Sequence, residues 1–205
     1  MKIFGNDGFR SKFGFKYMTI EFLSAFGFGI IDYCKCKNYD LPILFGRDTR
    51  SSGLIIEKFL TSLINYGGIN TVSAGIIPTP GLSYALQPDI YSMGIMITAS
   101  HNPFYDNGIK LFSSEGLKLL KKEEEILERK ILERLKNRNY RFEGMIGIHK
   151  FSNSLSKKYA NGIKNSFKKP NIDYKILIDC SNGAFSKVAK YALKSYQNIV
   201  FINDS

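Results

Sequence analysis

The order of apolar and polar residues predicts alternating helices and strands. Apolar residues recur at helical spacing in four segments, 17–33, 55–64, 81–87 and 121–138. Continuous apolar or β-branched runs, typical of strands buried on both faces, occupy 41–46, 70–74 and 93–98. This alternation favours a three-layer α/β/α domain around a mixed, largely parallel sheet.

The C-terminal part of the chain predicts a second, smaller unit. A strand at 175–179, a helix at 184–196 and a strand at 199–202 form one βαβ unit. One such unit buries too little surface to make a domain. We therefore expect a first domain at 1–140, a linker with one helix at 141–170, and the incomplete start of a second α/β domain at 171–205. On this interpretation the chain is a fragment.

Two polar loops directly follow predicted buried strands. Arg47, Asp48, Thr49 and Arg50 come after the strand at 41–46, and Thr98–His101 ends the strand at 93–98. Ligands of open α/β sheets gather at the carboxyl ends of the strands. We expect both loops to lie on one rim of the sheet.

The composition indicates a folded protein with an excess of positive charge. Of 205 residues, 44% are hydrophobic and 23% charged, and 29 Lys and Arg against 18 Asp and Glu give a net charge of +11. This charge suits a polyanion or a phosphorylated ligand. An AT-rich genome that enriches lysine is an equally good explanation. A basic nucleic-acid-binding module is the alternative from another class, although most aromatic residues stand among apolar positions.

The cysteines and the N-terminus favour a cytoplasmic protein that does not cross a membrane. Cys34, Cys36 and Cys180 are odd in number and lack partners at zinc-site spacing, so we expect reduced thiols. No apolar signal segment follows Met1. The longest apolar stretch, 20–31, carries a glutamate and is shorter than a membrane span.

The segment TASHNP, residues 98–103, holds the best candidate for chemistry. Ser100 stands between small residues at a tight bend, so its hydroxyl is expected to be exposed. Acyl transfer is disfavoured, because His101 is adjacent in an extended chain and points to the opposite face. Phosphoryl transfer needs cations, and four are near in sequence or on the rim: Arg10, Arg47, Arg50 and Lys110. For each one alone, a surface charge or a salt bridge to Asp7 or Asp48 is the simpler explanation.

Five motifs together resemble the α-D-phosphohexomutase superfamily in order and spacing. They are FGNDGFR (4–10), GRDTRSSG (46–53), IPTP (77–80), TASHNPFYDNGIKLFSSEG (98–116) and ILIDCSNGA (176–184). The serine loop is most similar to that of members that interconvert glucosamine 6-phosphate and glucosamine 1-phosphate. Members acting on mannose or glucose phosphates, and a non-catalytic remnant, are the alternatives within this interpretation.

The resemblance implies a phosphosugar mutase that works through a bisphosphate intermediate. Ser100 matches the phosphoserine, His101 lies beside its phosphate, Lys110 assists proton transfer and Arg10 lines the cleft. Supporting positions are Arg47, Arg50 and Asn102. Asn6 and Ser11 stand where the family has Thr and Gly, and Ser11 places a Cβ where glycine's backbone freedom is expected to matter.

The resemblance also implies one Mg²⁺ per active site, held by the serine phosphate and three aspartates of a D-x-D-x-D-R loop. No D-x-D pair occurs in this sequence. Ser100, through its phosphate, is the one family metal ligand present. We therefore expect a phosphosugar as ligand, no nucleic-acid or membrane partner, and an isolated chain that cannot turn over substrate.

Overall fold

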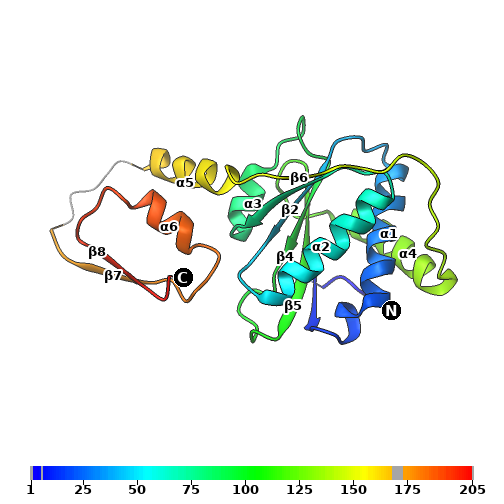
Figure 1. Cartoon of the computed structure of the whole chain (residues 1–205), viewed down its shortest axis with the longest axis horizontal. Coiled ribbons are helices and arrows are strands. Elements are labelled where there is room, and N and C mark those ends of the chain that lie inside the picture. The colour runs from blue at the N-terminus through cyan, green and yellow to red at the C-terminus, as the bar shows by residue number, and fades with distance from the viewer. Residues whose placement is uncertain (1, 6, 168–172, 205) are drawn as a thin grey trace.

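The computed structural model describes residues 2–5, 7–167 and 173–204, and its principal feature is a six-stranded mixed sheet, called the main sheet below (Figure 1). Four strands run parallel to one another, and two antiparallel strands complete one side. In spatial order the strands are β1 (Phe9–Lys12), β5 (Asp106–Ser113), β4 (Met93–Ile97), β2 (Ile43–Arg47), β3 (Thr71–Ile76) and β6 (His149–Phe151). The predicted mixed, largely parallel sheet is confirmed.

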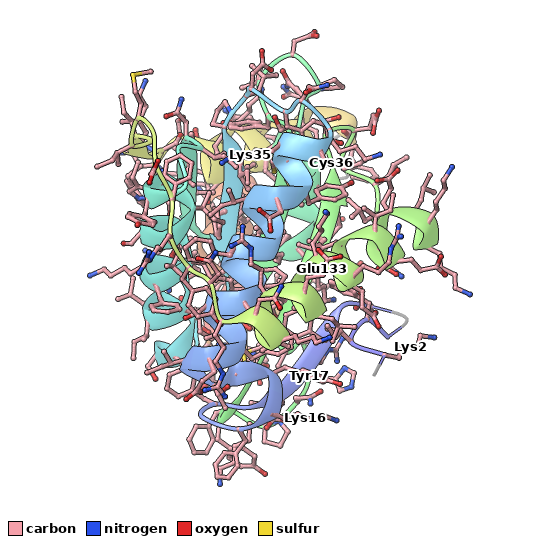
Figure 2. All side chains as sticks on the ribbon, turned by 90° about the vertical axis from the view of Figure 1, so that its right-hand side faces the viewer. Lys2, Lys16, Tyr17, Lys35, Cys36 and Glu133 are labelled. Atoms are coloured by element: carbon pink, nitrogen blue, oxygen red, sulfur yellow. The ribbon has the colours of Figure 1, made fainter. Side chains whose placement is uncertain are left out.

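Helices cover both faces of the main sheet and complete three layers. One face packs against α1 (Ile20–Cys36), α2 (Ser51–Tyr66) and α4 (Lys121–Asn137). The other carries α3 (Thr79–Ala85) and α5 (Leu155–Ser166). Figure 2 shows α1 and α4 crossing on the outer side, with Lys35 and Cys36 at the end of α1 and Glu133 on α4.

Helix α1 illustrates how local sequence and packing agree. A short 3₁₀ turn, η1 (Lys16–Met18), precedes it, and the Thr19 hydroxyl accepts a hydrogen bond from the Phe22 amide at 3.2 Å. Thr19 is thus the N-cap of α1, and its hydroxyl satisfies one of the free amides of the first turn. Gly29 lies against α4 so closely that a Cβ would come within 2.7 Å of the Ile131 side chain. Glycine weakens an isolated helix, but here it lets two helices approach.

The C-terminal residues form a separate βαβ unit, called the small unit below. Strands β7 (Ile176–Asp179) and β8 (Ile199–Ile202) pair in parallel, and α6 (Ser186–Ala192) connects them (Figure 1). Helix α6 packs on α5 through Ala160, Val188 and Ala192. The turn after β7 also contacts the loop after β2, because the Thr49 hydroxyl donates to the Asn182 carbonyl at 2.8 Å.

Three strands of the main sheet were not predicted from the sequence. Strand β1 contains two charged residues among its four, and β5 begins with Asp, Asn and Gly, which are depleted in strands. They form because β5 continues the chain from the TASHNP bend and pairs with β4 on one side and β1 on the other. Strand β6 comes from the segment expected as a linker and pairs with β3. The domain boundaries proposed from the sequence stay a prediction.

Two further expectations concern membrane-spanning segments and the state of the cysteines. Within the described ranges, no helix combines the length and the apolar character that a bilayer span requires. Cys34, Cys36 and Cys180 are all free thiols. Burial raises the pKa of the Cys34 thiol to about 12, so this cysteine is an inert part of the core.

Candidate active site

The two predicted polar loops lie together at the carboxyl ends of β2 and β4. These strands pair in parallel, with Arg47 opposite Ile97. Beyond the last pair, the Asp48 amide donates to the Ile97 carbonyl at 3.1 Å, so the loops leave the sheet side by side. The expectation that both loops share one rim is confirmed.

Ser100 stands at the tip of the second loop in a left-handed backbone conformation. Its φ is 58°, which is uncommon for a residue with a Cβ. The Ser100 amide donates to the Thr98 hydroxyl at 3.0 Å, and the Asn102 amide donates to the Ala99 carbonyl at 3.1 Å. The residue is exposed, and its hydroxyl has no hydrogen-bond partner within the described ranges. The loop is therefore held by its backbone, while the hydroxyl stays available.

Asp48 and Arg50 fasten the serine loop to the first loop. The Asp48 carboxylate accepts from the Thr98 hydroxyl at 2.7 Å and from the Arg50 amide at 3.0 Å, and it also pairs with the Arg50 guanidinium. Arg50 in turn donates to the carbonyls of Ser100 at 3.1 Å and Asn102 at 2.6 Å. Charge-assisted bonds of this kind are stronger than neutral ones. Asp48 and Arg50 thus act as a clamp on the bend that carries Ser100.

Arg47 contacts α2 and the first loop, and among the described residues it makes no hydrogen bond to the serine loop. Its guanidinium pairs with Glu57 of α2 at 2.9 Å and donates to the Asp48 carbonyl at 3.3 Å. Glu57 is itself buried and accepts a short hydrogen bond from Ser73 on β3. Arg47 consequently ties the end of β2 to α2 and β3.

Arg10 and Lys110 come from the two antiparallel strands and share one carboxylate. Asp7 Oδ2 lies 2.5 Å from Lys110 Nζ and 3.1 Å from Arg10 Nη2. Arg10 also donates to the Asn102 side chain at 3.3 Å, and Asn102 donates to Asp106 at 2.9 Å. Partial burial works to raise the pKa of Asp7, but Lys110 and, to a lesser degree, Arg10 hold it below its ordinary value. Lys110 is linked to the serine loop through Asp7, Arg10 and Asn102.

Gly108 makes room for Arg10 at this edge of the sheet. The two residues are paired across β1 and β5, and a Cβ on Gly108 would come within 2.7 Å of Arg10 Cγ and of the Thr98 carbonyl. Any side chain at this position would therefore push Arg10 or the serine loop away.

The structure also places the remaining predicted residues of the motifs. His101 is exposed next to Ser100. Ser11 lies in the extended strand β1, paired with Asn107, and its hydroxyl donates to the Phe15 carbonyl at 2.8 Å. Ser11 does not have a positive φ, so the expectation that glycine's backbone freedom matters at this position is wrong. Asn6 lies outside the described residues.

The family of this chain follows from a comparison of its sequence with known protein families. Residues 1–138 match the phosphoglucomutase/phosphomannomutase family, alpha/beta/alpha domain I. The chain belongs to the phosphoglucomutase/phosphomannomutase family.

Relatives in this family align with the whole chain. The phosphoglucosamine mutase of Helicobacter pylori strain P12 is 38% identical over 208 residues, which cover 100% of this chain and 46% of the relative. That of Nautilia profundicola is 39% identical over 210 residues, with coverages of 100% and 46%. A family protein from Burkholderia thailandensis has the same fold, with a TM-score of 0.79 at 21% identity over 99% of this chain and 44% of that one. The chain spans just under half the length of the curated relatives it matches.

The carboxylates near Ser100 do not form a metal site by themselves. No group of three or more His, Cys, Asp or Glu side chains in the described ranges could hold an ion. Asp7 and Asp48 pair with cations, and Asp106 accepts from Asn102. The described residues therefore do not fit Mg²⁺ as a closed site, and we derive no chemical step from it.

Three residues of this family site were not singled out as functional from the sequence. Asp48 organises both loops, Asp7 joins the two cations, and the fully buried Asn107 donates to the Ser52 hydroxyl at 2.9 Å. Asp7 and Asp48 could have been found from their motifs, since each stands within three residues of an arginine in a loop that the sequence already marked. Asn107 gave no such signal.

Proposed function

We propose that this chain carries the phosphoserine part of a phosphosugar mutase site, with Ser100 as phosphoryl donor and acceptor. The observation that carries the proposal is the exposed Ser100 hydroxyl on a bend that Asp48 and Arg50 hold through side-chain contacts. A nucleophile that must reach a bulky phosphosugar has to be exposed, and its backbone has to be fixed.

The nearby cations fit the charge that such a reaction moves. A phosphoserine carries about −1.5 to −2 charges at neutral pH. Arg10 of β1 donates to Asn102 of the serine loop, and Lys110 of β5 is linked to Arg10 through Asp7, so both are proposed to provide positive charge for the phosphate. His101 stands beside the serine and is proposed to contact its phosphate. Arg47, Arg50 and Asn102 are proposed to position the loop rather than to contact the sugar.

The proposed step balances without an oxidant or reductant. The bond between Ser100 Oγ and phosphorus breaks as a sugar hydroxyl oxygen bonds to the phosphorus. The sugar hydroxyl gives up its proton, with Lys110 proposed to assist the transfer, and Ser100 Oγ takes up a proton as it leaves the phosphorus. The phosphoryl group that the sugar carried at the start then transfers from the bisphosphate to Ser100 Oγ. The proton of Ser100 goes to the freed sugar oxygen, and the phosphoserine is restored.

The relatives support glucosamine phosphate as the substrate. Both aligned relatives are named phosphoglucosamine mutase, and the alignment includes the serine loop. We accordingly propose the interconversion of glucosamine 6-phosphate and glucosamine 1-phosphate, with other hexose phosphates as the alternative. Mg²⁺ remains part of the proposal, with the serine phosphate as one ligand, although the family's aspartate ligands are absent from this sequence.

The test is direct detection of phosphate on Ser100. The 205-residue chain is incubated with glucosamine 1,6-bisphosphate and Mg²⁺, digested, and mapped by mass spectrometry. We expect phosphate on the peptide containing Ser100, none in Ser100→Ala, and unchanged labelling in Ser166→Ala, which removes a hydroxyl on α5. Absence of phosphate on Ser100 in the unaltered chain would reject the donor role and favour a chain that only binds.

The activity of these 205 residues alone is a separate question. We expect labelling of Ser100 but no steady conversion of glucosamine 6-phosphate, because each turnover needs two phosphoryl transfers and an open rim excludes little water. A coupled assay with Mg²⁺ and a trace of bisphosphate measures this. Sustained turnover would show that the described rim suffices for catalysis.

A further inference from the structure

Asp7 is the carboxylate that neutralises the cations beside the serine loop. One oxygen of Asp7 contacts both Lys110 and Arg10, at 2.5 Å and 3.1 Å. Within the described ranges, neither cation forms an ion pair with any other acid. The neighbouring carboxylate of Asp106 accepts a hydrogen bond from the Asn102 side chain. Two positive charges therefore share one negative charge, and a net positive charge remains.

Exposure differs sharply between the acid and its main partner. The Asp7 side chain is 49% exposed, whereas that of Lys110 is 11% exposed. A half-exposed carboxylate can return to water at little cost, because exposed ion pairs contribute only about 0–1 kcal/mol. The more buried ammonium depends more strongly on having an anion nearby. Asp7 is thus the partner that can leave.

We propose that Asp7 is a built-in counter-ion that a phosphoryl group displaces from Lys110 and Arg10. A phosphoryl group brings more negative charge than a carboxylate and three acceptor oxygens. With Asp7 in place, Lys110 and Arg10 stay ordered while no phosphoryl group is present. Once a phosphoryl group is present, Asp7 competes with it and weakens its retention.

This inference rests on the proposed function in one respect, namely that Ser100 carries the phosphoryl group that displaces Asp7. A site that only binds phosphate functions best with the highest affinity. A site that transfers a phosphoryl group must also release it, and a competing carboxylate that stabilises the unphosphorylated state favours this release. Asp7 is accordingly a positioning residue that sets how firmly the rim holds a phosphoryl group.

The experiment measures binding of inorganic phosphate to the unphosphorylated chain by isothermal titration calorimetry. Asp7→Asn removes the competing charge and keeps the shape of the side chain. Asp40→Asn is the matched control, because Asp40 is exposed and precedes β2, at the opposite end of the strand from the rim. We expect Asp7→Asn to bind phosphate about three- to tenfold more tightly and Asp40→Asn to bind within twofold of the unaltered chain.

Equal or weaker phosphate binding by Asp7→Asn would overturn the inference, and so would undetectable binding in both proteins. Asp7→Ser, which also lacks the charge, provides a second test if Asp7→Asn does not fold. A purely structural role for Asp7 predicts weaker binding in both variants, so tighter binding is diagnostic. The result is independent of Ser100 labelling, and a failure of the mutase proposal is therefore distinguishable from a failure here.

Discussion

The main sheet and the small unit use apolar residues in opposite ways. In the main sheet, helices cover both faces, and Phe26 of α1 and Phe45 of β2 are fully buried. The small unit has one helix, α6, for its two strands, and the side chains of Leu177 and Val200 are 64% and 54% exposed. The same kind of strand sequence therefore lies in a core in one region and at a surface in the other.

This contrast shows that a βαβ sequence specifies strand pairing but not burial. Both strands of the small unit alternate between half-buried and exposed positions, as a two-stranded sheet with one helix requires. Burial of the other face needs a further layer. The main sheet has that layer, and we expect most of the chain's stability to come from it.

The largest expected difference between the regions is the cost of removing a core side chain. We expect Phe26→Ala to lower the free energy of unfolding by about 3–5 kcal/mol, because it leaves a cavity between α1 and β1. Leu177→Ala removes an exposed side chain and should cost less than about 0.5 kcal/mol. Urea unfolding followed by circular dichroism measures both. Similar losses would mean that the exposed face of β7 is covered in solution.

Thiol reactivity sharpens the same comparison. We expect Cys180 in the small unit and the exposed Cys36 to react with a disulfide reagent at pH 8 in the native protein. Cys34, with a pKa near 12, has about a thousandfold less thiolate than an ordinary cysteine and should react only in urea. We expect two thiols that react in the native protein and one that requires denaturant, and Cys34→Ala should abolish the reaction that requires denaturant. A third thiol that reacts in native protein would contradict it.

Removal of an ion pair should give the smallest difference in stability loss between the two regions. Asp32 on α1 receives two hydrogen bonds of 2.6 Å from Arg134 of α4, and both side chains are largely buried. Loss of this carboxylate charge in Asp32→Asn should cost about 1–3 kcal/mol. Asp204→Asn, which weakens the exposed pair with Lys190, should cost about 0–1 kcal/mol. Thermal unfolding of the two variants measures both effects, and a larger loss for Asp204→Asn would reverse the comparison.

The parts of the fold that follow local periodicity could be predicted from the sequence. Helices α1, α2 and α4 and the parallel strands β2, β3 and β4 have strong apolar patterns that mark them. Strands β1 and β5 could not be found in this way. Their Asn, Gly and charged residues oppose strand formation, and pairing with residues nearly 100 positions away overrides that preference.

The candidate site was predictable to a similar extent. The joint rim follows from parallel strands that each end in a polar loop, and Ser100 stands out within it. The sequence offered Asp7 and Asp48 as possible ion-pair partners for any of the four cations, Lys110 included. Which acid pairs with Lys110 was not predictable, because this depends on the register of β1 against β5. The three-dimensional structure therefore identified the ion-pair partner of Lys110, whereas the sequence alone indicated Ser100 as the candidate nucleophile.

The left-handed backbone at position 100 limits which amino acid can serve there. Residues with a branched Cβ avoid positive φ, because their side chain collides with the neighbouring carbonyl. Threonine, chemically an equivalent alcohol, would strain the bend or flatten it. Glycine and asparagine adopt this conformation readily but bring no alcohol. The shape of the main chain thus favours serine over threonine at this position.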